Sequence, residues 1–266
     1  MMNRQSSSPK CWEWGMSLNA AIELADIKAA GLDCIEIVLN GKRFYKDFSE
    51  AKQYYQSAVE KAQKLDLRVA SLHLPYGKKW DVSLRKPGLR NDIIHLHYEL
   101  LKLAAEWEIP CAVIHPSYEP ISGKDRPERL AICRESLKWL SQAANSLGLR
   151  LAAECLPRTC LGNTSDEMIE LLRDNEYLGV CCDVNHLFQE SPEAFIRKIG
   201  EHIVTLHISD NDGIDERHWM PGEGVIHWES VIGALSEVGY EGPFMLEVVK
   251  PNPGNIAECL QRLFQV

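Results

Sequence analysis

The chain has 266 residues, of which 45% are hydrophobic and 25% charged, and its formal net charge is −9 with a pI of about 5.5. This acidic balance argues against a general basic surface for nucleic acid or anionic membranes, although it leaves room for a local basic patch. No apolar run approaches membrane-spanning length, and residues 1–10 are polar and Ser-rich, so we expect a cytoplasmic protein with a flexible N-terminal tail.

Short apolar segments alternate along the whole chain with longer segments of helical period. We predict strands near residues 11–16, 33–39, 67–74, 111–116, 149–155, 178–184, 203–208 and 243–248. We predict helices near residues 18–30, 47–65, 89–108, 127–147, 165–174, 192–201, 228–238 and 255–264. No linker or change in composition marks a boundary, so residues 11–266 are expected to form one domain.

The predicted strands are nearly continuous apolar runs, as at residues 112–114 and 203–206. Such strands are typically buried on both faces, as in a parallel sheet. Strand–helix units repeated in this way predict a closed (β/α)8 TIM barrel. An open doubly wound sheet is the alternative, but the first turn, at residues 14–17, lacks the glycine-rich fingerprint that such sheets use to bind nucleotides.

Local signals support the helix boundaries. Thr164 and Glu167 have the spacing of a capping box at a helix start. Gly31, Gly148 and Gly239 each follow a helical run, where a left-handed residue usually ends a helix. The longest connections follow the third and seventh strands, at residues 75–88 and 209–226, and long loops on one face of a barrel usually carry function.

Several chemically distinctive residues have a structural interpretation. The nine cysteines form no CxxC pair and lie within apolar runs, so we expect them to be reduced and buried. His95 and His97 lie on a predicted amphipathic helix and are expected to face solvent or the barrel exterior. Four tryptophans could line a sugar site, although core packing is an equal interpretation for the first two: Trp12, Trp14, Trp80 and Trp219.

A metal-competent side chain stands where each of six apolar strands ends. In a barrel, these positions converge on the mouth at the carboxyl ends of the strands. Carboxylates gathered out of water repel one another, and a divalent cation would relieve that repulsion. A mixture of His, Asp and Glu suits Mn, Zn, Fe or Co better than Ca. The six residues are His73, His115, Glu154, Asp183, His207 and Glu247, with Glu36 inside the second strand as a weaker seventh case.

Two local patterns extend this candidate metal site. The D-x-x-H step at residues 183–186 can turn Asp183 and His186 toward one region just past a strand. The loop at residues 217–224 adds His218 near the same face, although a plain Pro-Gly turn would account for its glycines. Each residue taken alone could instead be a core histidine or a salt-bridge partner; their repetition at successive strand ends favours a shared site.

At these positions the chain resembles the xylose-isomerase-like TIM barrels. That family includes sugar phosphate isomerases/epimerases, ketose 3-epimerases, inosose dehydratases and the endonuclease IV type of apurinic endonuclease. The resemblance extends from about Cys11 to the end of the chain. Its most specific motifs are Ser71–Tyr76, Val113–Pro116, Ala153-Glu154 with Arg158, Asp183–His186, His207–Asp210, Pro221–Gly224 and Leu246-Glu247.

The resemblance implies roles for individual residues. In the epimerase branch, the two glutamates that bind the cation also act as acid and base, which implies catalytic roles for Glu154 and Glu247. The same branch implies one cation held by Glu154, Asp183, His207 and Glu247, and substrate contacts from His186 and Arg217. Two further candidates for substrate binding are Arg158, which belongs to the family motif after the fifth strand, and Trp219, whose aromatic face could pack on a sugar. The endonuclease branch uses three zinc ions, which implies that a second metal or the substrate is bound by His73, His115, His186, Glu216 and His218.

The predicted function is a divalent-metal-dependent isomerase or epimerase that acts on a sugar or sugar phosphate through a metal-stabilised enediolate. We expect a small sugar or polyol substrate, no nucleic acid or membrane partner, and an assembly that could be a homo-oligomer. Glu223, where a phosphate loop would lie, favours an uncharged sugar. The alternatives are an inosose-type dehydratase, an endonuclease IV-like apurinic-site phosphodiesterase and a catalytically silent sugar-binding barrel. Pro157 and Cys160 stand where ketose 3-epimerases carry Asn and a second Glu.

Overall fold

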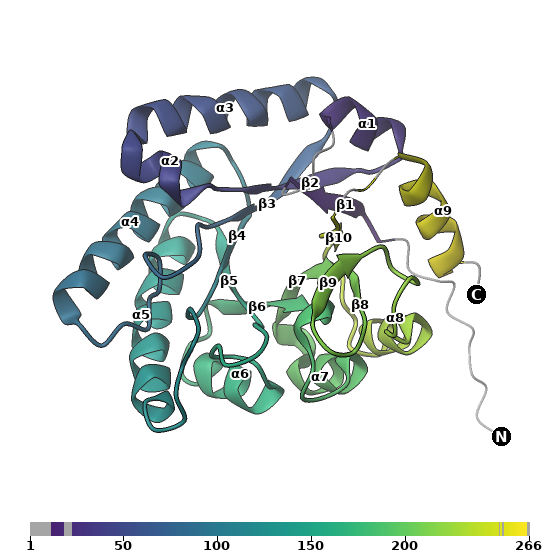
Figure 1. Cartoon of the computed structure of the whole chain (residues 1–266). Helices are drawn as coiled ribbons and strands as arrows, with labels where there is room; N and C mark the ends of the chain where they lie inside the picture. The colour runs from purple at the N-terminus through teal and green to yellow at the C-terminus, as the bar shows by residue number, and fades with distance from the viewer. Residues whose placement is uncertain (1–11, 19–22, 250, 252, 265–266) are drawn as a thin grey trace.

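The computed structural model describes residues 12–18, 23–249, 251 and 253–264. Parallel strands close into a barrel in the order β1-β10-β7-β6-β5-β4-β3-β2. Helices surround this barrel on the outside (Figure 1). The predicted single-domain (β/α)8 barrel is therefore confirmed. The tail predicted at residues 1–10 lies outside the described residues.

The barrel strands lie close to the predicted segments, and each neighbouring pair is parallel. The carboxyl ends of all eight strands therefore meet at one mouth of the barrel. The strands are β1 (Trp14–Ser17), β2 (Cys34–Val38), β3 (Arg68–His73), β4 (Cys111–Ile114), β5 (Arg150–Glu154), β6 (Leu178–Asp183), β7 (Ile203–Ile208) and β10 (Phe244–Leu246).

The predicted helices are also present, with shifts at their ends. α1 begins only at Leu24, later than the predicted start at residue 18. Among the described residues, no helix has both the length and the apolar character needed to cross a membrane. The helices are α1 (Leu24–Ala29), α2 (Gly41–Lys46), α3 (Phe48–Lys64), α4 (Pro87–Glu106), α5 (Arg126–Ser146), α6 (Ser165–Leu172), α7 (Pro192–Ile199), α8 (Trp228–Glu237) and α9 (Pro253–Phe264), with short 3-10 turns η1 (Val184–His186) and η2 (Gly200–His202).

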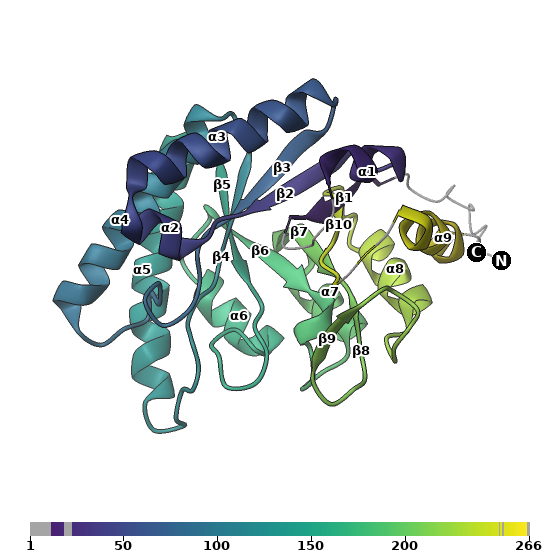
Figure 2. The same cartoon turned by 45° about the horizontal axis from the view of Figure 1, so that its top comes forward.

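A short helix and a hairpin were not predicted. α2 is a six-residue helix whose start is capped by the Asn40 side chain, which accepts a hydrogen bond from the Lys42 backbone N–H at 3.0 Å. An antiparallel hairpin of β8 (Asp210–Asn211) and β9 (Glu216–Trp219) occupies the long connection after β7. Figure 2 shows this hairpin apart from the barrel wall. Both elements belong to the loops around the mouth.

The predicted helix signals have mixed outcomes. The Thr164 hydroxyl accepts a hydrogen bond from the Glu167 backbone N–H at 3.3 Å and so caps α6. The other half of the capping box does not form, because the Glu167 carboxylate binds Arg126 instead. The three glycines predicted to end helices all have positive φ, at 84° for Gly31, 81° for Gly148 and 71° for Gly239.

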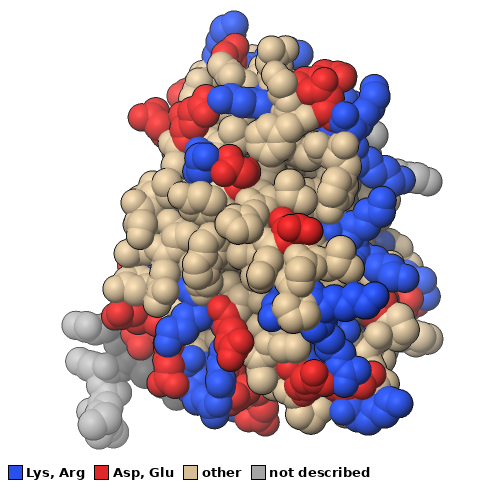
Figure 3. Space-filling view, turned by 90° about the vertical axis from the view of Figure 1, so that its left-hand side faces the viewer, with Lys and Arg blue, Asp and Glu red and all other residues tan. Residues whose placement is uncertain are grey.

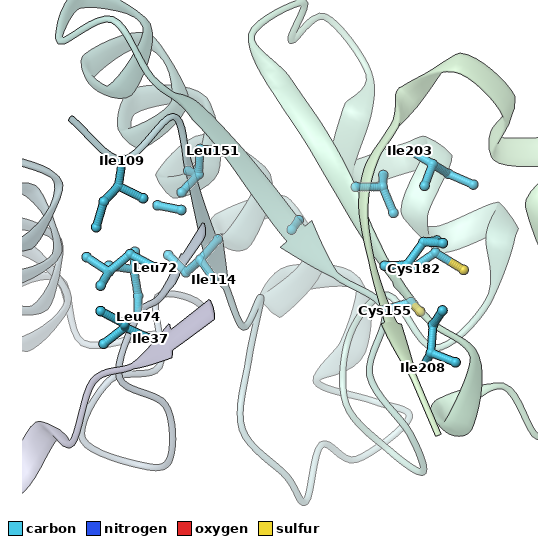
Figure 4. Close-up of a cluster of buried hydrophobic side chains, with 14 of the residues drawn as sticks. Ile37, Leu72, Leu74, Ile109, Ile114, Leu151, Cys155, Cys182, Ile203 and Ile208 are labelled. Carbon is cyan, nitrogen blue, oxygen red and sulfur yellow. The ribbon is translucent and has the colours of Figure 1, made fainter. Parts of the chain in front are cut away.

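The main core lies between the barrel and its helices. Figure 4 shows Leu72, Ile114 and Leu151, from three successive strands, packed together in this layer. Small residues such as Val113, Ala152 and Cys181 form a separate cluster. Successive strand residues point to opposite faces, so Leu72 joins the core while His73 can face the barrel interior. This alternation delivers polar side chains to the mouth.

Outside the mouth, one prediction about the exposure of a side chain is wrong. His97 on α4 is fully buried, rather than facing solvent, because the loop after β3 covers it and the carbonyl of Trp80 lies 3.1 Å from its Nε2. His95 is exposed, as predicted. The described cysteines are all free; Cys111 is half-buried and the others are buried, which agrees with the prediction.

Candidate metal centre

The strand ends enclose a cavity of about 170 Å³ at the mouth of the barrel. Most of its lining side chains are polar, and Leu156, Pro157 and Cys160 also line it. Asp183 and His207 are fully buried and belong to a residue group that includes the wall residue Glu247. The predicted site residues that line the cavity are His73, His115, Glu154, Arg158, His186, Glu216, His218 and Glu247.

Four of the predicted site residues form a compact group of potential metal ligands. Glu154, Asp183, His207 and Glu247 each offer one atom within 4.8 Å of the others. His207 Nδ1 lies 3.3 Å from Glu247 Oε2, 3.4 Å from Glu154 Oε1 and 4.0 Å from Asp183 Oδ2. These residues lie at or just after the carboxyl ends of four neighbouring parallel strands, β5, β6, β7 and β10, so the sheet brings together residues that are far apart in the sequence.

The hydrogen bonding within this group fits a bound cation. Asp183 Oδ2 and His207 Nδ1 are buried and have no hydrogen-bond partner among the described residues. His186 Nδ1 lies 3.1 Å from Asp183 Oδ2 but is directed at the carbonyl of Cys155, 3.0 Å away. A buried polar atom left without a partner costs about 1–3 kcal/mol. A cation bound by both atoms would remove that cost.

The electrostatics of the group point the same way. Burial raises the pKa of the Asp183 carboxyl to about 7, despite nearby His186, and the charges of Glu247 and Glu154 act in the same direction as burial. Burial opposes the ionisation of Glu154 too, but His115 and His207 outweigh it and hold its pKa well below the usual range. Several carboxylates thus compete for limited positive charge, which a divalent ion would supply.

Glu154 connects this group to two further histidines. Its Oε2 lies 3.0 Å from both His73 Nε2 and His115 Nε2. Its Oε1 lies 3.4 Å from both His186 Nδ1 and His207 Nδ1. Although burial opposes it, the hydrogen bond and charge of Glu154 raise the pKa of His73 to about 9. His73, Glu154 and His207 form a second set of potential ligands.

A third set lies at the outer wall, where β9 faces η1. His186 Nε2 lies 2.8 Å from Glu216 Oε2, and His218 completes a group within 4.8 Å. Arg158 holds the other oxygen of Glu216 through two contacts of 3.0 Å. The hydrogen bond from His186, with Arg158 beside it, lowers the pKa of Glu216 to about 2 against the opposing effect of burial. The structure thus brings together the predicted histidines from five separate segments.

A family model described as a xylose isomerase-like TIM barrel matches residues 24–265. The chain belongs to this family. The match covers nearly the whole described structure, including all three sets of potential ligands.

Relatives of this xylose isomerase-like barrel extend over most of its length. An uncharacterised protein of Methanocaldococcus jannaschii is 25% identical over 240 residues, which cover 87% of this chain and 79% of that protein. D-psicose 3-epimerase of Ruminiclostridium cellulolyticum is 24% identical over 249 residues, which cover 89% and 80%. A solved D-tagatose 3-epimerase-like protein superposes with a TM-score of 0.78 at 23% identity and covers 94% of this chain and 95% of its own.

Two predicted substrate-binding residues of this xylose isomerase-like barrel lie elsewhere. Neighbouring residues of a strand point to opposite faces. β9 therefore directs Glu216 and His218 to the cavity, and exposes Arg217 and Trp219 on its other face. Arg217 Nε donates to Asp212 Oδ2 at 2.7 Å. A substrate contact for Arg217 or Trp219 stays a prediction that this arrangement does not favour.

The other tryptophans also lie outside the cavity. Trp12 and Trp14 pack against Phe244 at the opposite end of the barrel, with ring centroids 4.7 and 5.0 Å apart. The core-packing interpretation therefore holds for both. Trp80 is buried at the edge of a second hollow beside the mouth.

Sequence reasoning missed the position of Glu36 in this xylose isomerase-like barrel. Instead of joining the candidate ligands, the fully buried Glu36 lies behind His207, with its Oε1 2.9 Å from His207 Nε2. Its other oxygen accepts a hydrogen bond from Ser71 Oγ at 2.7 Å. A carboxylate in this place orients a histidine ligand and fixes its tautomer. The inward position of Glu36 on β2 was visible in the sequence, but its partner was not.

Sequence reasoning placed Asp210 in a family motif but gave it no role, and in the structure it organises the loop that follows the hairpin. Its buried carboxylate accepts hydrogen bonds from the backbone N–H groups of Gly222 and Ile226 and from Trp228 Nε1. A Cβ at Gly224 would overlap this carboxylate, which explains a glycine there. The Pro-Gly-Glu-Gly motif is thus folded around Asp210, and this loop helps to position β9.

Proposed function

We propose that the protein is a divalent-metal-dependent isomerase or epimerase of a sugar or sugar phosphate. The observation that carries the proposal is the buried pair of unpartnered atoms, Asp183 Oδ2 and His207 Nδ1, in one group with Glu154 and Glu247. A bound Mn, Zn, Co or Fe ion would polarise the substrate carbonyl. The similarity to D-psicose 3-epimerase over most of both chains supports this class of reaction.

The two glutamates are suited to proton transfer in different ways. Glu247 lines the cavity, and its side chain is 14% exposed, so it can reach a substrate carbon. Glu154 Oε2 lies beside His73 and His115. The other oxygen, Oε1, lies beside His207 Nδ1, which also lies next to Glu247. One carboxylate removes the proton from the carbon beside the carbonyl, and the other returns a proton to the same or the adjacent carbon.

The test is exchange of a carbon-bound hydrogen with solvent. Ketoses, aldoses and inososes, free and phosphorylated, are incubated with the Mn-loaded protein in deuterated buffer, and label and product are both followed by NMR. We expect label at the carbon beside the carbonyl for one class of sugar. Glu247→Gln should abolish the label without unfolding the protein. Glu229 is exposed on α8, and Glu229→Gln should leave the label unchanged.

Other outcomes would identify a different reaction. Product without label would indicate a hydride shift, and loss of water would indicate an inosose-type dehydratase. If no sugar yields label or product, the proposed isomerase or epimerase activity is wrong.

A second candidate is the apurinic-site phosphodiesterase. The observation that favours it is the presence of three sets of potential ligands, two of which share Glu154 and His207, because several clustered metals suit phosphodiester cleavage. The net charge of −9 counts against DNA binding. Metal analysis separates the two: one ion per chain favours the isomerase, whereas three ions together with cleavage of abasic-site DNA would establish the phosphodiesterase.

A further inference from the structure

A second hollow lies directly beside the candidate metal centre. It has a volume of about 1350 Å³ and is bounded by the end of β2, by α2 and α3, and by the loop after β3. Tyr76 forms part of the wall of both hollows. Its ring stacks on His115, with centroids 4.5 Å apart. We call this larger hollow the groove. It is adjacent to the cavity and shares the side chain of Tyr76 with it.

The walls of the groove are held in place by specific contacts. The Tyr45 hydroxyl of α2 donates a hydrogen bond to the carbonyl of Lys79 at 2.8 Å, and its ring lies 4.9 Å from that of Trp80. Gly41 allows this approach, because a Cβ there would overlap Trp80 Nε1. The Nε2 of buried His97 lies 3.1 Å from the carbonyl oxygen of Trp80 and so helps to hold Trp80 in place. The unpredicted helix α2 and the loop after β3 thus contact each other along the rim of the groove.

Aromatic faces are exposed in the groove. Tyr45, Tyr54 and Tyr76 all line it, and they are 46%, 52% and 46% exposed. Large aromatic side chains gathered at one exposed place commonly mark a binding surface. Their rings offer flat apolar contact area, and their hydroxyls remain available for polar contacts.

The groove is also locally basic on an acidic protein. Arg43 lies over the Tyr54 ring at 4.0 Å and Lys79 over the Tyr45 ring at 5.5 Å, so both present charge beside aromatic faces. Figure 3 views the face of the molecule that carries α2 and α4, and Lys and Arg gather toward the right-hand edge of this face. Five cations line the groove against two acids, and none of the five forms an ion pair within the described part of the chain: Lys42, Arg43, Lys61, Lys78 and Lys79, against Glu23 and Glu50.

The sizes of the two hollows define what each can hold. The cavity of about 170 Å³ has room for roughly six waters at about 30 Å³ each, and ligand pockets usually measure about 300–1,000 Å³. The cavity can therefore hold the reacting end of a sugar but no large substituent. A substituent must extend outward, and the groove beyond Tyr76 is the adjacent space with complementary charge for an anion.

We propose that the groove binds the phosphate of a phosphorylated sugar whose reacting end lies in the metal cavity. This inference rests on the proposed function, and it names the phosphorylated member of the substrate class. The geometry uses Lys42 and Lys78 as charges for the phosphate and Tyr76 as the contact between the two parts of the substrate. None of residues 220–224 lines the groove, so Glu223 does not oppose an anion bound there.

Equilibrium binding tests the groove independently of turnover. Fructose 1-phosphate, fructose 6-phosphate and fructose are titrated calorimetrically into protein kept metal-free with a chelator, so that no bound cation can attract the phosphate. We expect at least one phosphorylated sugar to bind about tenfold more tightly than fructose, which corresponds to about 1.4 kcal/mol. The double variant Lys42→Gln/Lys78→Gln should reduce that preference to less than about twofold, because it removes two charge-assisted contacts.

The matched control removes the same charge elsewhere. Lys64→Gln/Lys138→Gln changes two exposed lysines that do not line the groove, and it should keep the preference. The preference should also decline with added salt, because exposed charges are screened. Equal binding of fructose and both phosphates, or a preference that survives Lys42→Gln/Lys78→Gln, would overturn the proposal.

The outcomes also separate this proposal from the proposed reaction. If the phosphate preference depends on Lys42 and Lys78 but no sugar exchanges hydrogen with solvent, the groove is an anion site and the isomerase reaction is wrong. If fructose and its phosphates exchange hydrogen equally well in wild type and in the groove variant, the reaction stands and the groove proposal is wrong.

Discussion

We expect Glu36→Gln to weaken metal binding while the barrel stays folded. The Glu36 carboxylate is fully buried and lies 2.9 Å from His207 Nε2. In that position it holds the Nε2 proton, so the Nδ1 lone pair points toward Glu154, Asp183 and Glu247. Glutamine has the same shape and can still accept a hydrogen bond, but it lacks the charge that makes His207 a stronger ligand.

The magnitude follows from this arrangement. Loss of a carboxylate behind a histidine ligand typically costs about 10- to 100-fold in metal affinity. This range corresponds to about 1.4–2.7 kcal/mol of binding free energy. Ser71→Ala removes the contact of 2.7 Å on the far oxygen of Glu36 and keeps the contact to His207, so its effect should be smaller. Asp183→Asn removes a candidate ligand itself and should cost more than either.

The assay is competition for Zn or Mn between the protein and a fluorescent chelator, with metal content measured separately by elemental analysis. Circular dichroism and the midpoint of thermal unfolding show whether each variant is folded. The reasoning would be refuted if Glu36→Gln bound metal within about twofold of wild type while Asp183→Asn lost it, since the affinity scale expects at least about tenfold.

Two further predictions concern stability. Burial lowers the pKa of His97 to about 4, so between about pH 6.5 and pH 4 the unfolded chain binds a proton at His97 that the folded protein does not bind. The free energy of unfolding should therefore fall by about 3 kcal/mol as the pH drops through this window. In urea titrations, His97→Gln should reduce this dependence of stability on pH. An unchanged slope would contradict this assignment. Gly224→Ala should cost about 1–3 kcal/mol, because its Cβ would overlap Asn211 and Asp210, whereas Gly233→Ala, with open space around it, should cost nothing in thermal unfolding. Equal stability of the two alanine variants would refute this account of the loop.

The convergence of the site could be predicted because it depends on short-range patterns. Parallel strands bring their carboxyl ends together, and a polar residue after each apolar run must therefore lie at the mouth. This reasoning places His73, Glu154, Asp183, His207 and Glu247 without any knowledge of long-range contacts. The barrel itself follows from the same repetition of strands and helices.

The remaining features depend on contacts that no local pattern records. Glu36 and His207 are 171 residues apart, and only barrel closure places one behind the other. The apolar period of α4 predicts which face His97 shares, but it does not predict that Trp80 covers it. α2 has six residues, too few for a clear helical period. The direction of Arg217 depends on the pairing of a short hairpin, which composition does not define.

The hairpin has a consequence for how such a barrel can diversify. A shift of one residue exchanges the two faces of a strand. One residue inserted in the turn at 212–215, matched by one deletion after Trp219, would turn Arg217 and Trp219 toward the cavity and Glu216 and His218 away from it. An imidazole–carboxylate wall would become a guanidinium–indole wall, suited to stacking on a sugar. Two small changes in loop length could therefore alter the chemistry of the mouth while every barrel strand kept its sequence.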